Sequence, residues 1–142
     1  MTLYLDCEFN GHGGELISIA LVSDKSPHKF YGVMPLPFAL TDWVQKHVVP
    51  ILGQDPEPEN ELRFRLKLFL EQFEGEEIIA DWPDDFAHLM KLMSGPTYAA
   101  SFSVPCMMTL LNSGEVRPVL PHNALSDAEA LMYWHQSVRG AA

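Results

Sequence analysis

The sequence predicts one α/β domain in which strands come first and helices then alternate with strands. Two observations support this fold class. Three strand-like apolar segments with short connections occupy residues 3–34, and apolar residues at helical spacing begin only after residue 40. A chain of 142 residues is long enough for one sizeable core and too short for two ordinary domains. We therefore assign residues 1–142 to a single domain.

The first three strands are expected to form an antiparallel meander. Residues 3–9 (LYLDCEF) and 29–34 (KFYGVM) are strand-like. Residues 16–22 (LISIALV) are apolar throughout, which is typical of a strand that is buried on both faces. The Gly-rich NGHGGE and the segment DKSPH are turns between them.

Helices are expected in the middle of the chain. Thr41 can cap a helix through TDWVQKHV, which Pro50 ends. Residues 59–73 place apolar side chains at helical spacing after a polar, proline-rich loop. A short strand at 76–81 precedes a helix at 84–93, which Gly-Pro ends.

The C-terminal part predicts one or two strands and a final helix. Residues 97–112 carry a mixed strand signal. Residues 126–138 (SDAEALMYWHQSV) are strongly helical, and Ser126 and Glu129 have the spacing of a capping box.

Composition limits the classes of function. The formal net charge of −10 argues against broad electrostatic binding of nucleic acid, although bound metal ions can supply positive charge locally. No apolar run approaches the ~20 residues of a membrane span, and no signal peptide is recognisable. With two cysteines and no disulfide pattern, a cytoplasmic location and no membrane partner are expected.

Asp6 and Glu8 lie in the middle of the first apolar strand, where unpaired carboxylates are costly. Strand side chains alternate between faces, so these two project from one face with Cα atoms roughly 6.5–7 Å apart. Carboxylates on a rigid strand suit hard divalent cations. The alternative is two solvated acids on an exposed strand edge.

Two other segments carry candidate groups. Asp81, Asp84 and Asp85 follow the strand at 76–81, where they can instead be ordinary helix-capping acids. His122 precedes Asp127 by five residues at the start of the last helix. Taken singly, these two fit a loop histidine and a first-turn acid equally well.

The order of these segments resembles the DEDDh 3′–5′ exonucleases, the superfamily of RNase T, oligoribonuclease and the proofreading subunit of bacterial DNA polymerase. The likeness covers residues 4–134 and comprises Asp-x-Glu-Phe on the first strand, an Asp after a middle strand, and a last motif formed by His122, Ala124, Asp127 and Ala128. Within the superfamily, YLDCEFNGHGGELISIALV and WVQKHVVP are most similar to the RNase AS type, a polyadenylate-specific exoribonuclease.

The resemblance implies an RNase H-like fold: a mixed β-sheet flanked by helices. It implies a hydrolase of RNA processing that releases nucleoside 5′-monophosphates from the 3′ end of single-stranded RNA. Two Mg²⁺ ions, with Mn²⁺ as an alternative, would be held by four carboxylates. Three of these are Asp6, Glu8 and Asp127, and His122 would be the general base.

The identity of the fourth carboxylate is open between two residues. Asp81 ends the apolar strand, where α/β sites commonly form. The family pattern, laid on ADWPDDFAHL without gaps, puts Asp85 at the metal-binding position, although Asp84 replaces an aromatic residue. We predict Asp85 as the ligand, in the first turn of a helix, and Asp81 as a supporting residue or alternative ligand.

The remaining expectations concern substrate and assembly. The resemblance suggests that Phe9 stacks on the terminal base and that Asn10 lies near the terminal sugar, with Trp82 a second aromatic surface. Phe9 and Trp82 can equally be packing residues. DNA is an alternative substrate, a non-catalytic binding or assembly module is an alternative function, and a homodimer is compatible with the sequence.

Overall fold

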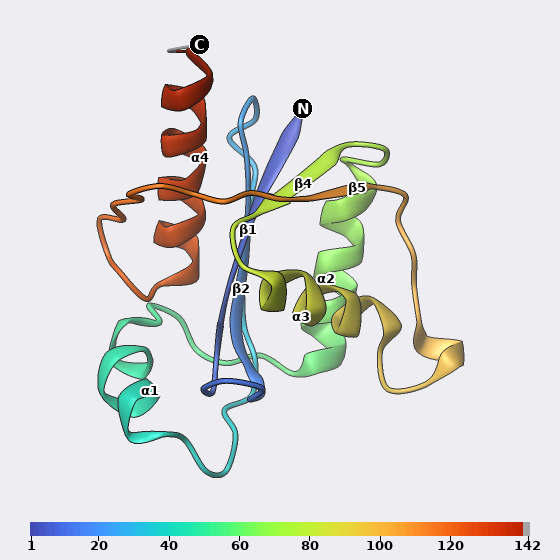
Figure 1. Ribbon diagram of the computed structural model, residues 1–142. Helices are drawn as coiled ribbons and strands as arrows, with labels where there is room; N and C mark the ends of the chain where they lie inside the picture. The colour runs from blue at the N-terminus through green and yellow to red at the C-terminus, as the bar shows by residue number, and fades with distance from the viewer. Residues whose placement is uncertain (141–142) are drawn as a thin grey trace.

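The chain forms a five-stranded sheet flanked by helices in a computed structural model that describes residues 1–140 (Figure 1). The strands are β1 Thr2–Phe9, β2 Leu16–Ser23, β3 Lys29–Val33, β4 Glu77–Ala80 and β5 Met107–Leu110. The α-helices are α1 Asp42–His47, α2 Glu59–Glu71, α3 Pro83–Ser94 and α4 Ala124–Gly140. Two short 3₁₀-helices, η1 Val49–Ile51 and η2 Tyr98–Ala100, complete the elements. The α/β class predicted from the sequence is confirmed.

The sheet is mixed, with strand order β3-β2-β1-β4-β5. β1 pairs with β2, and β2 with β3, in antiparallel fashion, which confirms the predicted meander. β4 and β5 then add to the other edge of β1 in parallel orientation. The segment 97–112 contains one strand, β5, and it forms an edge of the sheet.

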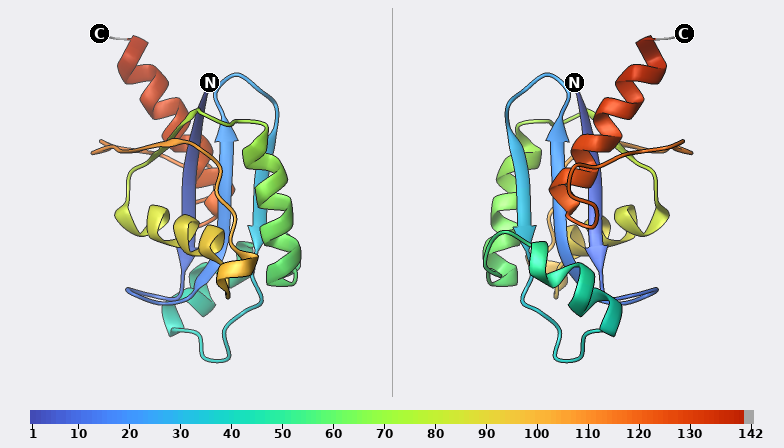
Figure 2. Two further views of the ribbon diagram at one scale, coloured as in Figure 1. Left: turned by 90° about the vertical axis from the view of Figure 1, so that its right-hand side faces the viewer. Right: turned by 90° about the vertical axis from the view of Figure 1, so that its left-hand side faces the viewer.

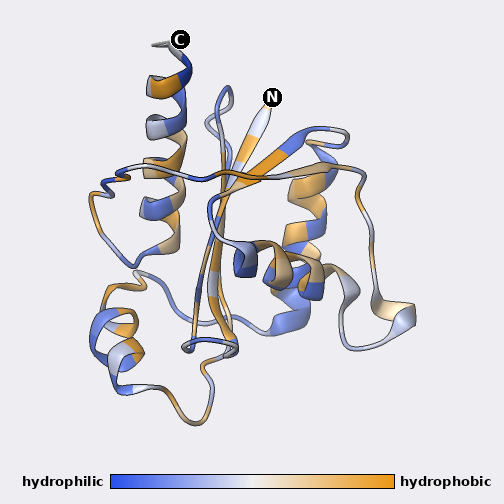
Figure 3. Ribbon diagram, viewed as in Figure 1, coloured by the Kyte–Doolittle hydropathy of each residue, from blue (hydrophilic) through white to orange (hydrophobic). Residues whose placement is uncertain are grey.

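Helices cover both faces of the sheet. α2 and α3 pack on one face and α4 on the other (Figure 2). The alternation of β1 matches this arrangement, since Leu3, Leu5 and Cys7 enter the α2–α3 core while Tyr4 packs with α4. Hydropathy follows burial in this arrangement. β4 is largely hydrophobic, whereas the exposed first turn of α2 is hydrophilic (Figure 3).

Most helix boundaries follow local signals. The Thr41 hydroxyl accepts a hydrogen bond from the Val44 N–H and caps α1 as predicted. Gly95 ends α3 with φ of 68°, a conformation that glycine adopts without strain. Within residues 1–140, no helix has both the length and the apolar character that crossing a membrane requires.

The start of the last helix differs from the prediction. α4 begins at Ala124, and the Asn123 side chain accepts the hydrogen bond of the Ser126 N–H. Ser126 therefore lies inside the helix, where its hydroxyl accepts from the Leu120 N–H. The predicted capping box of Ser126 and Glu129 is wrong, because only the residue just before a helix has the extended backbone that a cap needs.

β4 is shorter than β1 and leaves part of one edge of β1 without a neighbouring strand. β4 pairs with β1 only from Thr2 to Tyr4, whereas β1 continues to Phe9. The second half of β1 therefore has a neighbour on one side only. The first turns of α3 and α4 both reach this stretch of β1.

Candidate metal centre

Asp6 and Glu8 lie on the half of β1 that pairs with β2 alone, on the face that α4 covers. Their neighbours Leu5 and Cys7 are buried on the opposite face. Both carboxylates are half-buried rather than solvated. The predicted common face of Asp6 and Glu8 is confirmed, and an exposed strand edge is excluded.

Asp127 approaches the same face from the first turn of α4. Asp6, Glu8 and Asp127 each offer a carboxylate oxygen, and these three oxygens lie within 4.8 Å of one another. The helix start is held in place by Asn123, whose side-chain amide donates to the Ile51 carbonyl after α1. The loop histidine and the helix acid that are five residues apart in sequence thus lie at one site.

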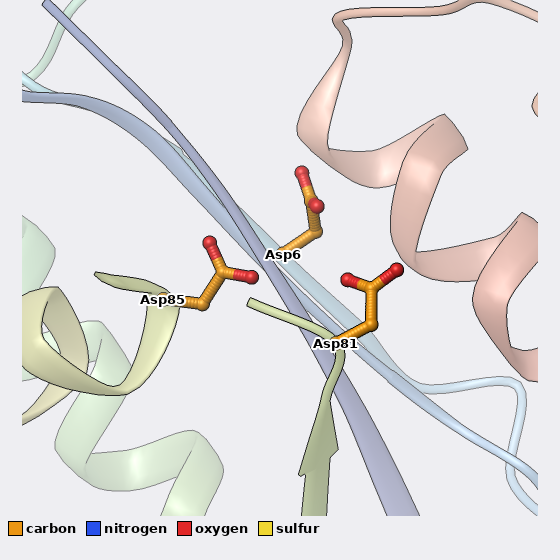
Figure 4. Close-up of side chains that lie close together, drawn as sticks. All are labelled: Asp6, Asp81 and Asp85. Carbon is orange, nitrogen blue, oxygen red and sulfur yellow. The ribbon is translucent and has the colours of Figure 1, made fainter. Parts of the chain in front are cut away.

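Asp81 and Asp85 also lie close to Asp6 (Figure 4). Asp81 directly follows β4, and Asp85 lies in the first turn of α3, as predicted. One oxygen from each of Asp6, Asp81 and Asp85 lies within 4.8 Å of the others. The structure therefore brings both candidates for the fourth carboxylate to the site, and Asp6 belongs to both groups of three.

Hydrogen bonds orient each outer carboxylate. Asp85 Oδ1 accepts from the Cys7 N–H at 3.2 Å, and Asp81 Oδ2 accepts from the Ser113 hydroxyl at 2.7 Å. Asp127 Oδ2 accepts from the His122 N–H at 3.2 Å. In each case one oxygen is held by the protein and the other remains for a ligand.

Two of these remaining oxygens, Asp85 Oδ2 and Asp127 Oδ1, are buried and lack a hydrogen-bond partner among the described residues. The same holds for Asp6 Oδ2. Asp85 is only 2% exposed. A buried carboxylate oxygen without a partner carries a large desolvation cost. An oxygen-rich donor set of this kind fits a hard divalent cation such as Mg²⁺ or Mn²⁺, so the residues present fit the metal that the sequence predicts.

The electrostatics agree with this donor set. Burial, followed by repulsion from Asp85 and Asp127, raises the pKa of Asp6 well above its usual range. Burial and the neighbouring Asp127 carboxylate raise the pKa of Glu8 to about 8. Burial and repulsion from Asp81 raise the pKa of Asp85 to about 8. Crowded carboxylates hold protons unless a cation replaces them.

Asp6, Glu8, Asp81 and Asp85 line a cleft of about 950 Å³. His122 lies at its wall and is exposed to solvent, with a left-handed backbone at φ of 69°. Phe9 and Trp82 also line the cleft. Phe9 is half-buried against the core and its ring lies 5.0 Å from that of His88, whereas Trp82 is 56% exposed and its indole N–H donates to Asp84.

The Asn10 side chain forms two hydrogen bonds with the segment that leads into α1. Its side-chain oxygen accepts from the Thr41 N–H at 2.9 Å, and its amide donates to the Ala39 carbonyl at 2.8 Å. These bonds join the end of β1 to the start of α1. Contact of this region with a substrate sugar stays a prediction.

Sequence reasoning missed two residues of this site, Trp43 and Ser113. Trp43 lines the cleft from α1, and Ser113 holds Asp81 from the segment after β5. The only local signal for Trp43 is an aromatic residue on a short helix in which Val44 is the sole other apolar residue. Ser113 carries no signal, because its contact spans 32 residues of chain.

No protein-family model matches this chain, and no curated protein matches it. The functional interpretation therefore depends on the carboxylates, the cleft and His122.

Proposed function

We propose that this protein is a metal-dependent 3′–5′ exonuclease of the DEDDh type with an RNase H-like fold, and that it hydrolyses single-stranded RNA. The mixed sheet that begins as an antiparallel meander and has helices on both faces supports this fold. The observation that carries the proposal is the pair of three-carboxylate groups that share Asp6. Two donor sets that share one carboxylate would hold two metal ions close together, as two-metal catalysis needs.

The roles of the side chains follow from their surroundings. Asp6, Glu8 and Asp127 form one donor set, and Asp6 with Asp85 and Asp81 forms the other. These groups would hold Mg²⁺, which would supply the charge that activates water and stabilises the leaving oxygen of a phosphodiester. His122, at the cleft wall, accepts the proton of the attacking water.

The cleft favours a short, unpaired end of nucleic acid. Phe9 and Trp82 give its walls aromatic surfaces, and bases of a single strand stack on such surfaces. The chain has nine Lys and Arg residues against nineteen Asp and Glu, so long phosphate tracts are not gripped by charge. This balance supports attack at one end of the substrate.

The test is a gel assay with 5′-labelled and 3′-labelled single-stranded RNA and DNA in Mg²⁺, with EDTA as the control. An exoribonuclease shortens 5′-labelled RNA one nucleotide at a time and releases 5′-monophosphates from 3′-labelled RNA. A 3′-terminal phosphate should block it. Equal degradation of blocked and free RNA would identify an endonuclease instead.

The same assay separates the alternatives. Faster digestion of DNA would make the protein a DNA exonuclease, because discrimination depends on contacts to the 2′-OH. Metal binding by calorimetry without cleavage of any substrate would leave a non-catalytic binding module. Equal-length homopolymers then test the preference for poly(A) that the RNase AS resemblance implies.

A further inference from the structure

The imidazole of His122 has few restraints of its own. The residue is exposed, and its backbone N–H is held by Asp127. Among residues 1–140, the ring itself forms no hydrogen bond. The backbone bond to Asp127 does not fix the side-chain torsions of His122. A general base must nevertheless hold its accepting nitrogen toward the attacking water.

Two aromatic rings of α1 lie near this ring: Trp43 and, farther away at 6.4 Å between centroids, His47. The Trp43 indole lies 4.8 Å from the His122 ring, centroid to centroid, with the planes at 80°. This edge-to-face arrangement is a preferred geometry of aromatic pairs. His47, one turn later on α1, lies 4.9 Å from Trp43 on the same helix and restrains the indole in turn.

α1 has a fixed position relative to both halves of the site. Thr41 caps the helix and its N–H donates to Asn10 at the end of β1. Asn123, next to His122, donates to the carbonyl of Ile51 beyond α1. Val44 anchors the helix in the core with 1% exposure. The indole is therefore attached to a rigid element, whereas the histidine is on a loop.

We infer that Trp43 is a positioning residue that sets the orientation of the His122 imidazole at the carboxylate cleft. The inference rests on the proposed function for its catalytic consequence, but the ring contact exists independently of it. Trp43 acts here through His122 and not through the substrate. Loss of the indole leaves the carboxylates, and thus metal binding, unchanged.

The first experiment measures the contact without any nuclease reaction. The ring protons of His122 are assigned by NMR in the wild type and in Trp43→Ala. The indole ring current should displace these signals, and Trp43→Ala should move them toward the values of an exposed histidine. Tyr98→Ala, which removes a remote aromatic side chain that is 98% exposed, should not move them. Unchanged His122 signals in Trp43→Ala would overturn the inference whatever the protein catalyses.

The second experiment measures single-turnover cleavage of RNA in saturating Mg²⁺. Trp43→Ala should lower the maximal rate about 10²-fold, as expected for misplacement of a reacting group. Trp43→Phe, which retains a ring, should recover most of the loss, whereas Trp43→Leu should not. The double variant of Trp43→Ala and His122→Ala should cleave RNA no more slowly than His122→Ala alone, since the two changes remove the same function.

Other outcomes separate the possible failures. A raised KM with an unchanged maximal rate would show that Trp43 stacks on substrate and would overturn the positioning role. A further loss in the double variant would do the same. If His122→Ala keeps full activity, the proposed general base is wrong, and the NMR result alone decides whether Trp43 orients the ring. If Trp43→Ala destabilises α1, Trp43→Leu replaces it in both experiments, because leucine keeps an apolar side chain at this position.

Discussion

The backbone N–H of Cys7 donates a hydrogen bond to Asp85 Oδ1 at 3.2 Å. This N–H lies on the part of β1 that β4 does not reach, so the carboxylate takes the place of a missing strand partner. The same bond fixes Asp85 with its second oxygen buried and unpaired beside Asp6. This one hydrogen bond thus satisfies the free N–H of β1 and also orients Asp85, a candidate metal ligand.

Asp85→Asn should nearly abolish cleavage, whereas Asp81→Asn should leave a measurable fraction. The amide retains an oxygen for the Cys7 N–H but removes a charged donor from a buried position. Asp81 is half-buried and already hydrogen-bonded to Ser113, so its loss should cost about 10–100-fold, as for residues that support ligands. Steady-state cleavage of 5′-labelled RNA measures both. Greater damage from Asp81→Asn would make Asp81 the principal ligand.

Asp6→Asn should lower turnover by orders of magnitude, because Asp6 belongs to both donor sets. In EDTA the same change should raise Tm by a few degrees, since it removes a carboxyl group that burial and the neighbouring acids make costly to ionise. Calorimetry should also record weaker Mn²⁺ binding. Asp55→Asn, at an exposed loop position, is the matched control for charge. A near-normal rate for Asp6→Asn in Mg²⁺ would show that the metal site lies elsewhere.

His122→Ala should slow cleavage about 10²–10⁴-fold, the usual contribution of a general base. Metal affinity should stay close to wild type, because the imidazole contributes no atom to either carboxylate group. Cleavage rates and Mn²⁺ titrations of the same samples separate the two effects. An unchanged rate would remove His122 from the mechanism.

The metal-free protein should lose stability as pH rises from about 5 to about 8. The pKa values of Glu8 and Asp85 are about 8 when folded, against roughly 4 for unfolded carboxyls, so the folded state binds more protons in this range. The free energy of unfolding therefore falls as these protons leave. Urea midpoints at pH 5, 6.5 and 8 in EDTA should decrease in that order.

Mg²⁺ should reverse this trend, because the cation binds the deprotonated carboxylates of the folded state. The gain in urea midpoint on adding Mg²⁺ should be larger at pH 8 than at pH 5. Stability that rises with pH in EDTA would contradict the raised pKa values of the site.

Local pattern was enough for the elements that depend on near neighbours. The alternation in residues 3–9 predicted that Asp6 and Glu8 share a face, and Thr41 predicted the start of α1. The end of α3 followed from Gly95. Local pattern misled at α4, where Ser126 and Glu129 have capping spacing but Asn123 is the cap. Several residues near a helix start can serve as its cap, and the position of the loop decides among them.

The sequence by itself determined the α/β class, the antiparallel first strands and the two carboxylates of β1, because these depend on periods of two and of 3.6 residues. Only the tertiary structure decided that Asp81 and Asp85 both join Asp6 and that Trp43 contacts His122. These contacts depend on where β4 ends beside β1 and where α1 packs near α4. Such distances arise from the packing of whole elements, and no local period in the chain records them.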